Sequence, residues 1–350
     1  MKTTALFIAS LLLTLAGCQS PLSENQNNTF QFKWERLKTP TQASFRGLSV
    51  VSEKELWLGG SQASCLLTTD AGKNWQTFNL NVADSLQFRD IEAFDNGTAY
   101  LLSAGSPALI YKTNNYGKTW KLQYENNRPD IFLDGMAFWN EETGLVMGDP
   151  TDGYFTMLKT TDGGKNWTRL KSEALPEPKN KEAGFAASGT NIVSKASQHA
   201  WFASGGGASR VFYTTDAGKS WHHSPTPVQQ GEASQGIFSL AFADTLRGVA
   251  VGGNYLAPDD CSKIACYTND GGKNWQPAVQ MPSGYRSGVA YFSKDQLFIA
   301  VGSNGTDYST DYGKSWKKID TVGYHSIQPV PGASIAWLSG DQGHVAKLSW

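Results

Sequence analysis

Thr68-Thr69-Asp70-Ala71-Gly72-Lys73-Asn74-Trp75 is the first of six nearly identical eight-residue boxes in this 350-residue chain. The other five boxes occupy residues 113–120, 160–167, 214–221, 268–275 and 309–316. Successive boxes begin 41 to 54 residues apart. A fixed period in this range is typical of one supersecondary unit copied around an array. The boxes therefore decide the fold.

Each repeat unit predicts four short strands. In the first unit, residues 45–51, 55–59 and 65–69 form apolar or alternating runs before the box, and residues 75–80 form another after the turn. Four short strands at this period make one blade of a β-propeller. No window shows a helical spacing of apolar residues, so we predict an all-β fold with almost no helix.

The two ends of the array predict one further blade. Residues 324–330, 334–338 and 344–349 follow the last box as three strands without a fourth. Residues 32–37 have the pattern of a fourth strand without the first three, with Trp34 placed as the box Trp is. Pairing the two ends would leave the ring without an open seam. We predict a seven-bladed β-propeller whose last blade is closed by the N-terminal strand; six blades with a loose tail is the competing count.

The box residues suit a folding role. Asp side chains accept hydrogen bonds from nearby backbone N–H groups in tight turns, Gly supplies positive φ, and Trp anchors the hairpin. The alternative, six calcium loops, lacks the ladder of carboxylates that such a loop needs. We predict no metal and no cofactor.

The N-terminus has the features of an exported lipoprotein. Residues 1–17 form a predicted lipoprotein signal peptide that ends at Leu15-Ala16-Gly17, and Cys18 is the predicted lipidation site; an ordinary cleaved secretory signal is the alternative. Residues 18–30 hold this Cys and a polar flexible tether, and residues 31–350 hold the propeller. The lipid would be the only membrane anchor. We predict a monomer in the bacterial cell envelope, at the outer membrane and facing the periplasm or the surface.

Charge and cysteine content narrow the possible partners. The chain has 30 Lys and Arg against 31 Asp and Glu, which disfavours nucleic-acid binding. Cys261 and Cys266 lie five residues apart in an exported chain, so we predict a disulfide between them. Cys65 has no evident partner and is predicted to be a buried thiol in a strand.

The innermost strands predict a basic site at one end of the channel. We aligned them on an aromatic residue that begins each one: Phe45, Phe88, Phe132, Phe185, Phe238, Tyr285 and Tyr324. The residue after this aromatic is Arg in blades one, two and six and His in blade seven, and these blades are contiguous around a ring. The predicted basic crescent consists of Arg286, His325, Arg46 and Arg89.

Guanidinium groups close together suit carboxylates or phosphates. The alternative is that each Arg bonds to an acidic neighbour such as Asp90 or Asp134 and merely ties the blades together. Asp134 is also counted among the candidate ligand-binding residues, with Asp149 and Asn304 on Gly-rich loops at the same rim.

The boxes resemble the BNR or Asp-box repeats of the sialidase superfamily, and in blade number and chain length the chain resembles the photosystem II stability/assembly factor-like propellers most. The resemblance covers residues 31–350. It implies a non-catalytic scaffold that binds a partner protein, with an Arg patch at the channel mouth where Arg46, Arg89 and Arg286 stand.

The sequence therefore predicts an envelope scaffold or assembly factor that binds an acidic or carboxylate-bearing partner, either an envelope protein or an acidic glycan. The alternative is a sialidase-like exo-glycosidase or lyase that acts on acidic sugars. Phe45-Arg46 resembles the start of the sialidase signature, but Gly47-Leu48 follows in place of Ile-Pro. No Tyr–Glu pair stands out as a nucleophile, and we assign no catalytic residue.

Overall fold

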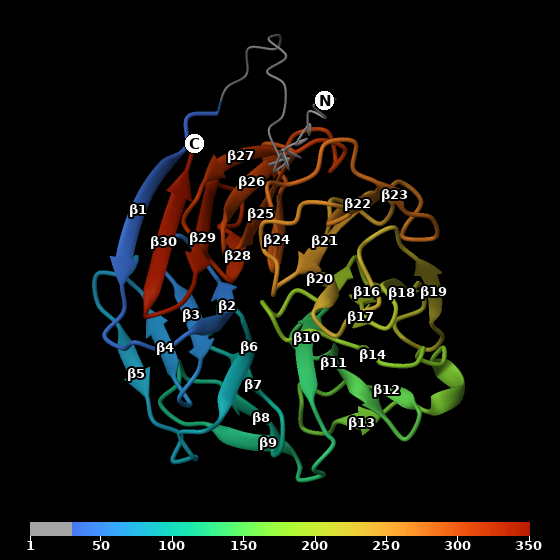
Figure 1. Cartoon of the computed structure of the whole chain (residues 1–350). Helices are drawn as coiled ribbons and strands as arrows, with labels where there is room; N and C mark the ends of the chain where they lie inside the picture. The colour runs from blue at the N-terminus through green and yellow to red at the C-terminus, as the bar shows by residue number, and fades with distance from the viewer. Residues whose placement is uncertain (1–29) are drawn as a thin grey trace, which may run out of the picture. The chain divides into compact units, whose positions relative to one another are not determined.

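The computed structural model describes residues 30–350 of the chain. Residues 31–350 form one compact unit, which is a closed ring of seven four-stranded antiparallel blades. Figure 1 shows the blades arranged around a central channel. The predicted seven-bladed all-β architecture is confirmed, and the single helical element of the described residues is one 3-10 turn, η1 (Ser172–Ala174). None of the described helices is long and apolar enough to cross a membrane.

The first three blades follow the chain order, with the innermost strand first. Blade one is β2 (Phe45–Val50), β3 (Leu56–Gly60), β4 (Cys65–Thr68) and β5 (Gln76–Phe78). Blade two is β6 (Gln87–Ala93), β7 (Ala99–Ala104), β8 (Ala108–Thr113) and β9 (Lys121–Asn126). Blade three is β10 (Leu133–Phe138), β11 (Gly144–Thr151), β12 (Tyr154–Thr160) and β13 (Thr168–Arg169).

The remaining blades complete the ring. Blade four is β15 (Ile192–Lys195), β16 (His199–Ala203), β18 (Arg210–Thr214) and β19 (His222–Pro225). Blade five is β20 (Gln235–Phe242), β21 (Gly248–Asn254), β22 (Ala265–Thr268) and β23 (Gln276–Pro277). Blade six is β24 (Gly288–Phe292), β25 (Leu297–Gly302), β26 (Gly305–Ser309) and β27 (Lys317–Asp320). Blade seven is β28 (Ser326–Pro329), β29 (Ile335–Ser339), β30 (His344–Ser349) and β1 (Lys33–Lys38).

The N-terminal strand closes the ring, as the sequence predicts. β1 pairs with β30 in continuous antiparallel register from Lys33–Ser349 to Lys38–His344. The blue and red ends of the chain lie side by side in Figure 1 for this reason. Because the first and last strands share one sheet, unfolding either end exposes a whole blade interface.

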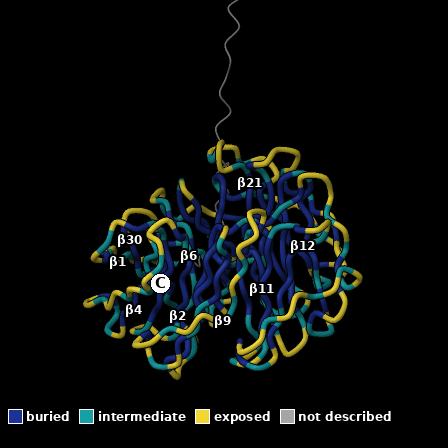
Figure 2. The backbone as a smooth tube through the Cα atoms, turned by 90° about the horizontal axis from the view of Figure 1, so that it is seen from below, coloured by how far each residue is buried: buried dark blue, intermediate teal, exposed yellow. Residues whose placement is uncertain are grey.

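The core consists of apolar layers between neighbouring blades. One layer joins blades three and four through residues such as Met147, Phe155, Phe202 and Trp221. Most residues of the inner three strands are buried, while the outermost strands and the loops carry most of the exposed residues, as Figure 2 shows. Close packing of this kind on every blade face makes the channel wall a rigid frame.

Blade four departs from the sequence prediction. We predicted its innermost strand at Phe185, but the strand is β15, which begins at Ile192. The segment before it forms β14 (Glu182–Ala183), which pairs with β17 (Gly205–Gly206), and β17 pairs with the inner strand of blade five. A fully buried ion pair holds this detour in place, since Arg210 Nε donates to Glu182 Oε1 at 2.8 Å. Residues 184–191, which we call the strap, therefore lie outside any strand.

The predicted disulfide between Cys261 and Cys266 is wrong. Cys266 is a free thiol on β22, 1% exposed, within the apolar layer between blades four and five. β22 pairs with a strand on each side, and the side chain of Cys266 packs into the core and not toward the loop that holds Cys261. Cys65 is a buried free thiol on β4, as predicted.

Candidate functional site

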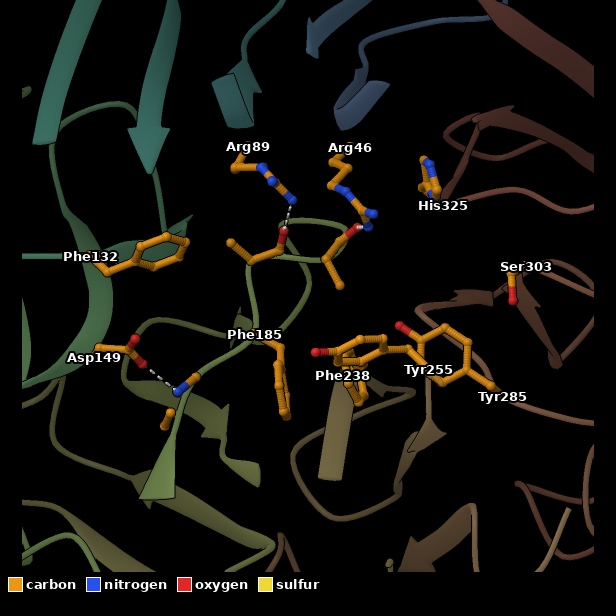
Figure 3. A pocket seen from close by; sticks show the side chains of 14 residues that line it. Arg46, Arg89, Phe132, Asp149, Phe185, Phe238, Tyr255, Tyr285, Ser303 and His325 are labelled. Carbon is orange, nitrogen blue, oxygen red and sulfur yellow. Dashed lines mark hydrogen bonds between the residues drawn. The ribbon is translucent and has the colours of Figure 1, made fainter. Parts of the chain in front are cut away.

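A pocket of about 630 Å³ opens at one mouth of the channel. This mouth lies at the N-terminal ends of the innermost strands, on the same side of the ring as the loops that connect second and third strands. The boxes lie at the opposite end, because each connects a third to a fourth antiparallel strand. Figure 3 shows basic side chains on one side of this mouth pocket and aromatic side chains on the other. The lining residues on these two sides are Arg46, Arg89 and His325, and Phe185, Phe238, Tyr255 and Tyr285.

Strand pairing identifies which residue of each blade faces the mouth. In blade one, Val50 pairs with Leu56, which pairs with Thr68 at the start of the box. The residue four before Val50 is Arg46, and the same counting gives Arg89, Asp134, Thr190, Phe238 and Ser287 in blades two to six. In blade seven, Trp34 pairs with Leu348, Leu348 with Ala336 and Ala336 with Pro329, and the residue four before Pro329 is His325. We call this the mouth position.

A β-bulge marks the mouth position in four blades. The register skips one residue between Phe45 and Gly47, and likewise at Asp134 in blade three, Arg89 in blade two and Phe238 in blade five. Bulges bend the strand and re-aim the extra side chain, and they are enriched beside functional sites. The bulge thus turns Arg46 and Arg89 toward the pocket instead of between blades.

Arg46 and Arg89 reach across the mouth to the strap. Arg46 Nη1 donates to the Ala187 carbonyl at 3.1 Å, and Arg89 Nη1 donates to the Ala186 carbonyl at 3.2 Å. Among the described residues, neither guanidinium has a carboxylate oxygen within 4.0 Å, and Arg89 Nε has no acceptor. Desolvation by burial, and then the charge of Arg46, lower the pKa of Arg89 to about 10. Two unneutralised cations side by side form a site for an anion.

His325 is the third residue of the basic side, and its imidazole carries no charge at neutral pH. Its Nε2 lies 2.9 Å from Asp341 Oδ1 and 3.1 Å from Ser44 Oγ. Burial lowers the pKa of His325 below its ordinary value, and the nearby Arg46 lowers it further, although the hydrogen bond with Asp341 opposes both. At neutral pH this imidazole offers a polar contact and no positive charge.

Arg286 does not join the basic side, so the predicted four-residue crescent is wrong at this member. Arg286 is fully buried and ion-paired with Asp307 of β26, with Nε donating to Asp307 Oδ2 at 2.7 Å. The mouth position of blade six is Ser287, one residue later, because Tyr285 lies six residues before the paired residue Tyr291, whereas Phe45 lies five residues before Val50. For Arg286 the alternative interpretation, an acidic partner that ties the structure together, is correct.

Two of the three predicted polar residues, Asp149 and Asn304, support segments around the pocket. Asp149 lines the pocket and its Oδ1 accepts the Gly184 backbone N–H at 2.8 Å, which anchors the strap. Asn304 Oδ1 accepts from Arg286 Nη1 at 2.7 Å, and its Nδ2 donates to the Pro258 carbonyl at 2.7 Å. Asn304 therefore supports the long loop of blade five and does not face the pocket.

Asp134 is buried behind Arg89. Neither of its carboxylate oxygens has a hydrogen-bond partner among the described residues, and a Cβ on Gly184 would lie 2.4 Å from Oδ2. Burial first, and then the charge of Asp149, raise the pKa of Asp134 well above its ordinary value. Asp134 makes no salt bridge with Arg89, since no oxygen of its carboxylate lies within 4.0 Å of the guanidinium. Asp90 accepts backbone N–H groups of Ile91 and Met136 at 2.8 and 2.7 Å, so it is not an arginine partner either.

The sequence does not predict the aromatic side of the pocket, because the seven aligned aromatics served only to align the innermost strands. Phe185 and Phe238 stack in the pocket with ring centroids 3.9 Å apart, and Phe132 and Phe185 are only half-buried. Counting four residues back from the hairpin between the first and second strands places Phe238 at the mouth position, in register with Arg46. Tyr255 has no counterpart in the other blades and could not have been found in this way.

A seven-bladed ring of box repeats with an anion-suited pocket at one mouth defines the class of protein. A family model described as "Photosynthesis system II assembly factor YCF48" matches residues 26–131, and a sortilin model matches residues 156–307. The chain is similar to the "Photosystem II assembly lipoprotein Ycf48" of a Synechococcus strain, 24% identical over 91% of this chain and 86% of that protein. It is likewise 24% identical to the Nostoc protein of the same name, over 96% of this chain and 88% of the other.

The solved structures agree in fold. A structure described as "YCF48 bound to D1 peptide" superposes with a TM-score of 0.64 at 16% identity and covers 91% of this chain and 97% of its own. The chain is a BNR-repeat propeller, and it is similar to photosystem II assembly proteins in sequence and in fold. These relatives are named assembly proteins, and the Synechococcus and Nostoc proteins are named lipoproteins. The predicted signal peptide and Cys18 lie outside the described residues.

Proposed function

We propose that this propeller is a non-catalytic assembly scaffold that holds a carboxylate-bearing segment of a partner protein in the mouth pocket. The observation that carries the proposal is the pair Arg46 and Arg89, which face the pocket without a carboxylate partner in the described residues. A guanidinium pair in a partly desolvated concave site binds carboxylates more strongly than exposed cations do. The family supports a protein as the partner, since one relative is described with a bound peptide.

The glycosidase alternative loses part of its support. A sialidase-type site needs three arginines around one carboxylate, and here Arg286 is buried against Asp307 instead. Tyr285 is the candidate for the nucleophilic tyrosine of such a site, but it is 6% exposed and packs edge-on against Phe238. The placement of Arg286 and Tyr285 thus favours anion binding over a sialidase-type mechanism.

The location of the scaffold follows from the N-terminal motif. Leu15-Ala16-Gly17-Cys18 and the lipoprotein names of two relatives support a lipid anchor at Cys18. Placement at the outer membrane, where the partner would be an envelope protein, rests on the resemblance to enteric-type lipoproteins, in which a residue other than Asp after the lipidated Cys, here Gln19, favours the outer membrane. An acidic glycan remains the less favoured occupant, because the pocket's second side is aromatic.

The test uses two synthetic peptides and isothermal titration calorimetry. We expect acetyl-Gly-Asp-Gly-Asp-Gly-amide to bind and its Asn counterpart to bind at least tenfold more weakly, since the charge-assisted hydrogen bonds are lost. The double variant R46Q/R89Q should bind the acidic peptide at least tenfold more weakly than the wild type. The matched control is R247Q, which removes one exposed arginine at the box end of the ring. Equal binding of the two peptides, or no binding of either at millimolar concentration, would overturn the proposal.

A further inference from the structure

The side of the pocket that faces Arg46 and Arg89 is a continuous aromatic wall. Phe185 and Phe238 stack at 3.9 Å with an interplanar angle of 12°. Tyr285 and Tyr255 both pack edge-on against Phe238, with centroids 4.9 and 6.1 Å away. All four residues line the pocket, and Figure 3 shows them opposite the two arginines. We call these four residues the aromatic wall.

One residue of the aromatic wall, Phe238, occupies the mouth position, which carries arginine in blades one and two. Phe238 is the bulge residue of blade five, in register with Arg46 and Arg89 in blades one and two. One structural position therefore presents cations on one side of the mouth and an aromatic ring on the other. The ring thus has an anion-binding subsite, formed by Arg46 and Arg89, and an apolar subsite, and both are fixed in one rigid frame.

The wall extends outward onto the rim. Tyr255 is 47% exposed, and the adjacent Leu256 is 74% exposed. Adjacent exposed apolar residues at the edge of a pocket mark an interaction surface. The apolar subsite is therefore open to a ligand side chain that approaches from solvent.

The buried network of blade six fixes the wall in place. Asp307 holds Arg286, Arg286 donates to Asn304, and Asn304 donates to the Pro258 carbonyl and to Asp259 Oδ1 at 2.8 Å. The backbone N–H of Tyr285 also donates to the Pro258 carbonyl, at 2.8 Å. The loop that carries Tyr255 is thus bound to the ring at several points. A preorganised wall costs little entropy when a ligand docks on it.

We propose that the pocket selects an acidic segment with a large apolar or aromatic side chain next to its carboxylate. This inference rests on the proposed function, since Arg46 and Arg89 bind the carboxylate in both. The charge complementarity of the two arginines orients the segment, and the neighbouring side chain packs on Phe185, Phe238 and Tyr255. A cavity of about 630 Å³ is in the size range of whole-ligand pockets and exceeds the needs of a carboxylate group. Purely acidic segments and purely apolar ones are both poorer occupants.

Three peptides separate this inference from the proposed function. They are acetyl-Gly-Asp-Phe-Asp-Gly-amide, acetyl-Gly-Asp-Gly-Asp-Gly-amide and acetyl-Gly-Asn-Phe-Asn-Gly-amide, each titrated by calorimetry. We expect the first to bind at least tenfold more tightly than either of the others, because burying one Phe ring changes affinity by this order. If the first two bind equally and the third does not, the apolar subsite is refuted while the proposed function stands. If no peptide binds, both fail.

Variants locate the subsite. F185A should reduce the advantage of the Phe peptide over the Gly peptide to less than threefold. Y255S provides a second variant, because this side chain is half-exposed and its loss does not open the core. The control is L122A, which removes an apolar side chain of 45% exposure on the outer strand β9. A Phe advantage that survives both F185A and Y255S would overturn the proposal.

Discussion

The two ends of the propeller treat their charged side chains in opposite ways. At the box end, each Asp carboxylate is saturated by its own turn: Asp70 accepts from the Asn74 backbone N–H, the Asn74 amide and the Thr68 hydroxyl, all within 2.9 Å. At the mouth, Arg46 and Arg89 share only two backbone carbonyls as acceptors. Saturated charge stabilises a fold, whereas unsaturated charge is retained at a cost and marks a site for a ligand.

Arg286 shows that the end of the ring at which a charged residue lies does not alone decide whether its hydrogen bonds are saturated. It lies near the same mouth, yet it behaves as the box carboxylates do, with Asp307, Ser283, Asn304 and a backbone carbonyl as partners. The other blades place Leu66, Tyr111, Leu158, Phe212 and Cys266 where blade six places Asp307, two residues before the box. One carboxylate on a third strand converts an arginine from a binding group into a structural one.

The largest expected effect is on stability, at Arg286. R286M leaves the Asp307 carboxylate buried without its partner, which should lower the free energy of unfolding by about 3–5 kcal/mol. Urea unfolding followed by tryptophan fluorescence measures it. The double variant R286M/D307L should recover most of the loss, since an apolar pair can replace a buried ion pair. A loss below about 1 kcal/mol in the single variant would place Arg286 with the binding arginines instead.

An intermediate effect is expected at the box end. Asp216 accepts from the Lys219 and Ser220 backbone N–H groups and from the Ser220 and Thr214 hydroxyls. D216A should cost about 1–2 kcal/mol in the same urea experiment. D216N should cost less, because Asn115 already fills this place in blade two and accepts the Thr119 backbone N–H at 3.0 Å. Equal losses in the two variants would contradict this account of the turn.

The pH dependence of the Asp216 contribution has a definite sign. Burial acts to raise its pKa, but the hydrogen bonds from Ser220, Thr214 and Lys219 prevail and lower it from 3.8 to about 2. A carboxyl with a depressed pKa in the folded state contributes its full stability above the unfolded value and loses it as pH falls. The difference between wild type and D216A should therefore be constant above pH 4 and shrink between pH 4 and pH 2. A difference that grows on acidification would be the opposite result.

The sequence predicts the fold well because its strongest signals are local. A box fixes a turn by hydrogen bonds within eight residues, and the period then fixes strand number and ring closure. The mouth is harder to predict because it depends on register. Anchoring the alignment on Tyr285 shifts blade six by one residue, and in a strand one residue moves a side chain to the other face. Counting from the box and the hairpin would have found Ser287.

Blade four and the cysteines failed for a different reason, which is non-local contact. The detour of residues 182–191 depends on the pairing of Glu182 with Arg210 and of β17 with blade five, and no local pattern encodes either. Cys266 was interpreted from its spacing to Cys261, although the alternation along β22 sends it into the core. Where a residue's partner lies in another blade, spacing along the chain carries little information.

The smallest expected effect on stability is at Arg46, and it makes the comparison with Arg286 quantitative. R46Q removes one hydrogen bond to the Ala187 carbonyl and also removes a cation that repels Arg89. The two changes have opposite signs, so the free energy of unfolding should stay within about 0.5 kcal/mol of the wild type. The acidic peptide should nevertheless bind more weakly, because one of the two guanidinium groups of the anion-binding subsite is removed. If R46Q destabilised the ring as much as R286M does, the distinction between saturated and unsaturated arginines would fail, since both would then be structural.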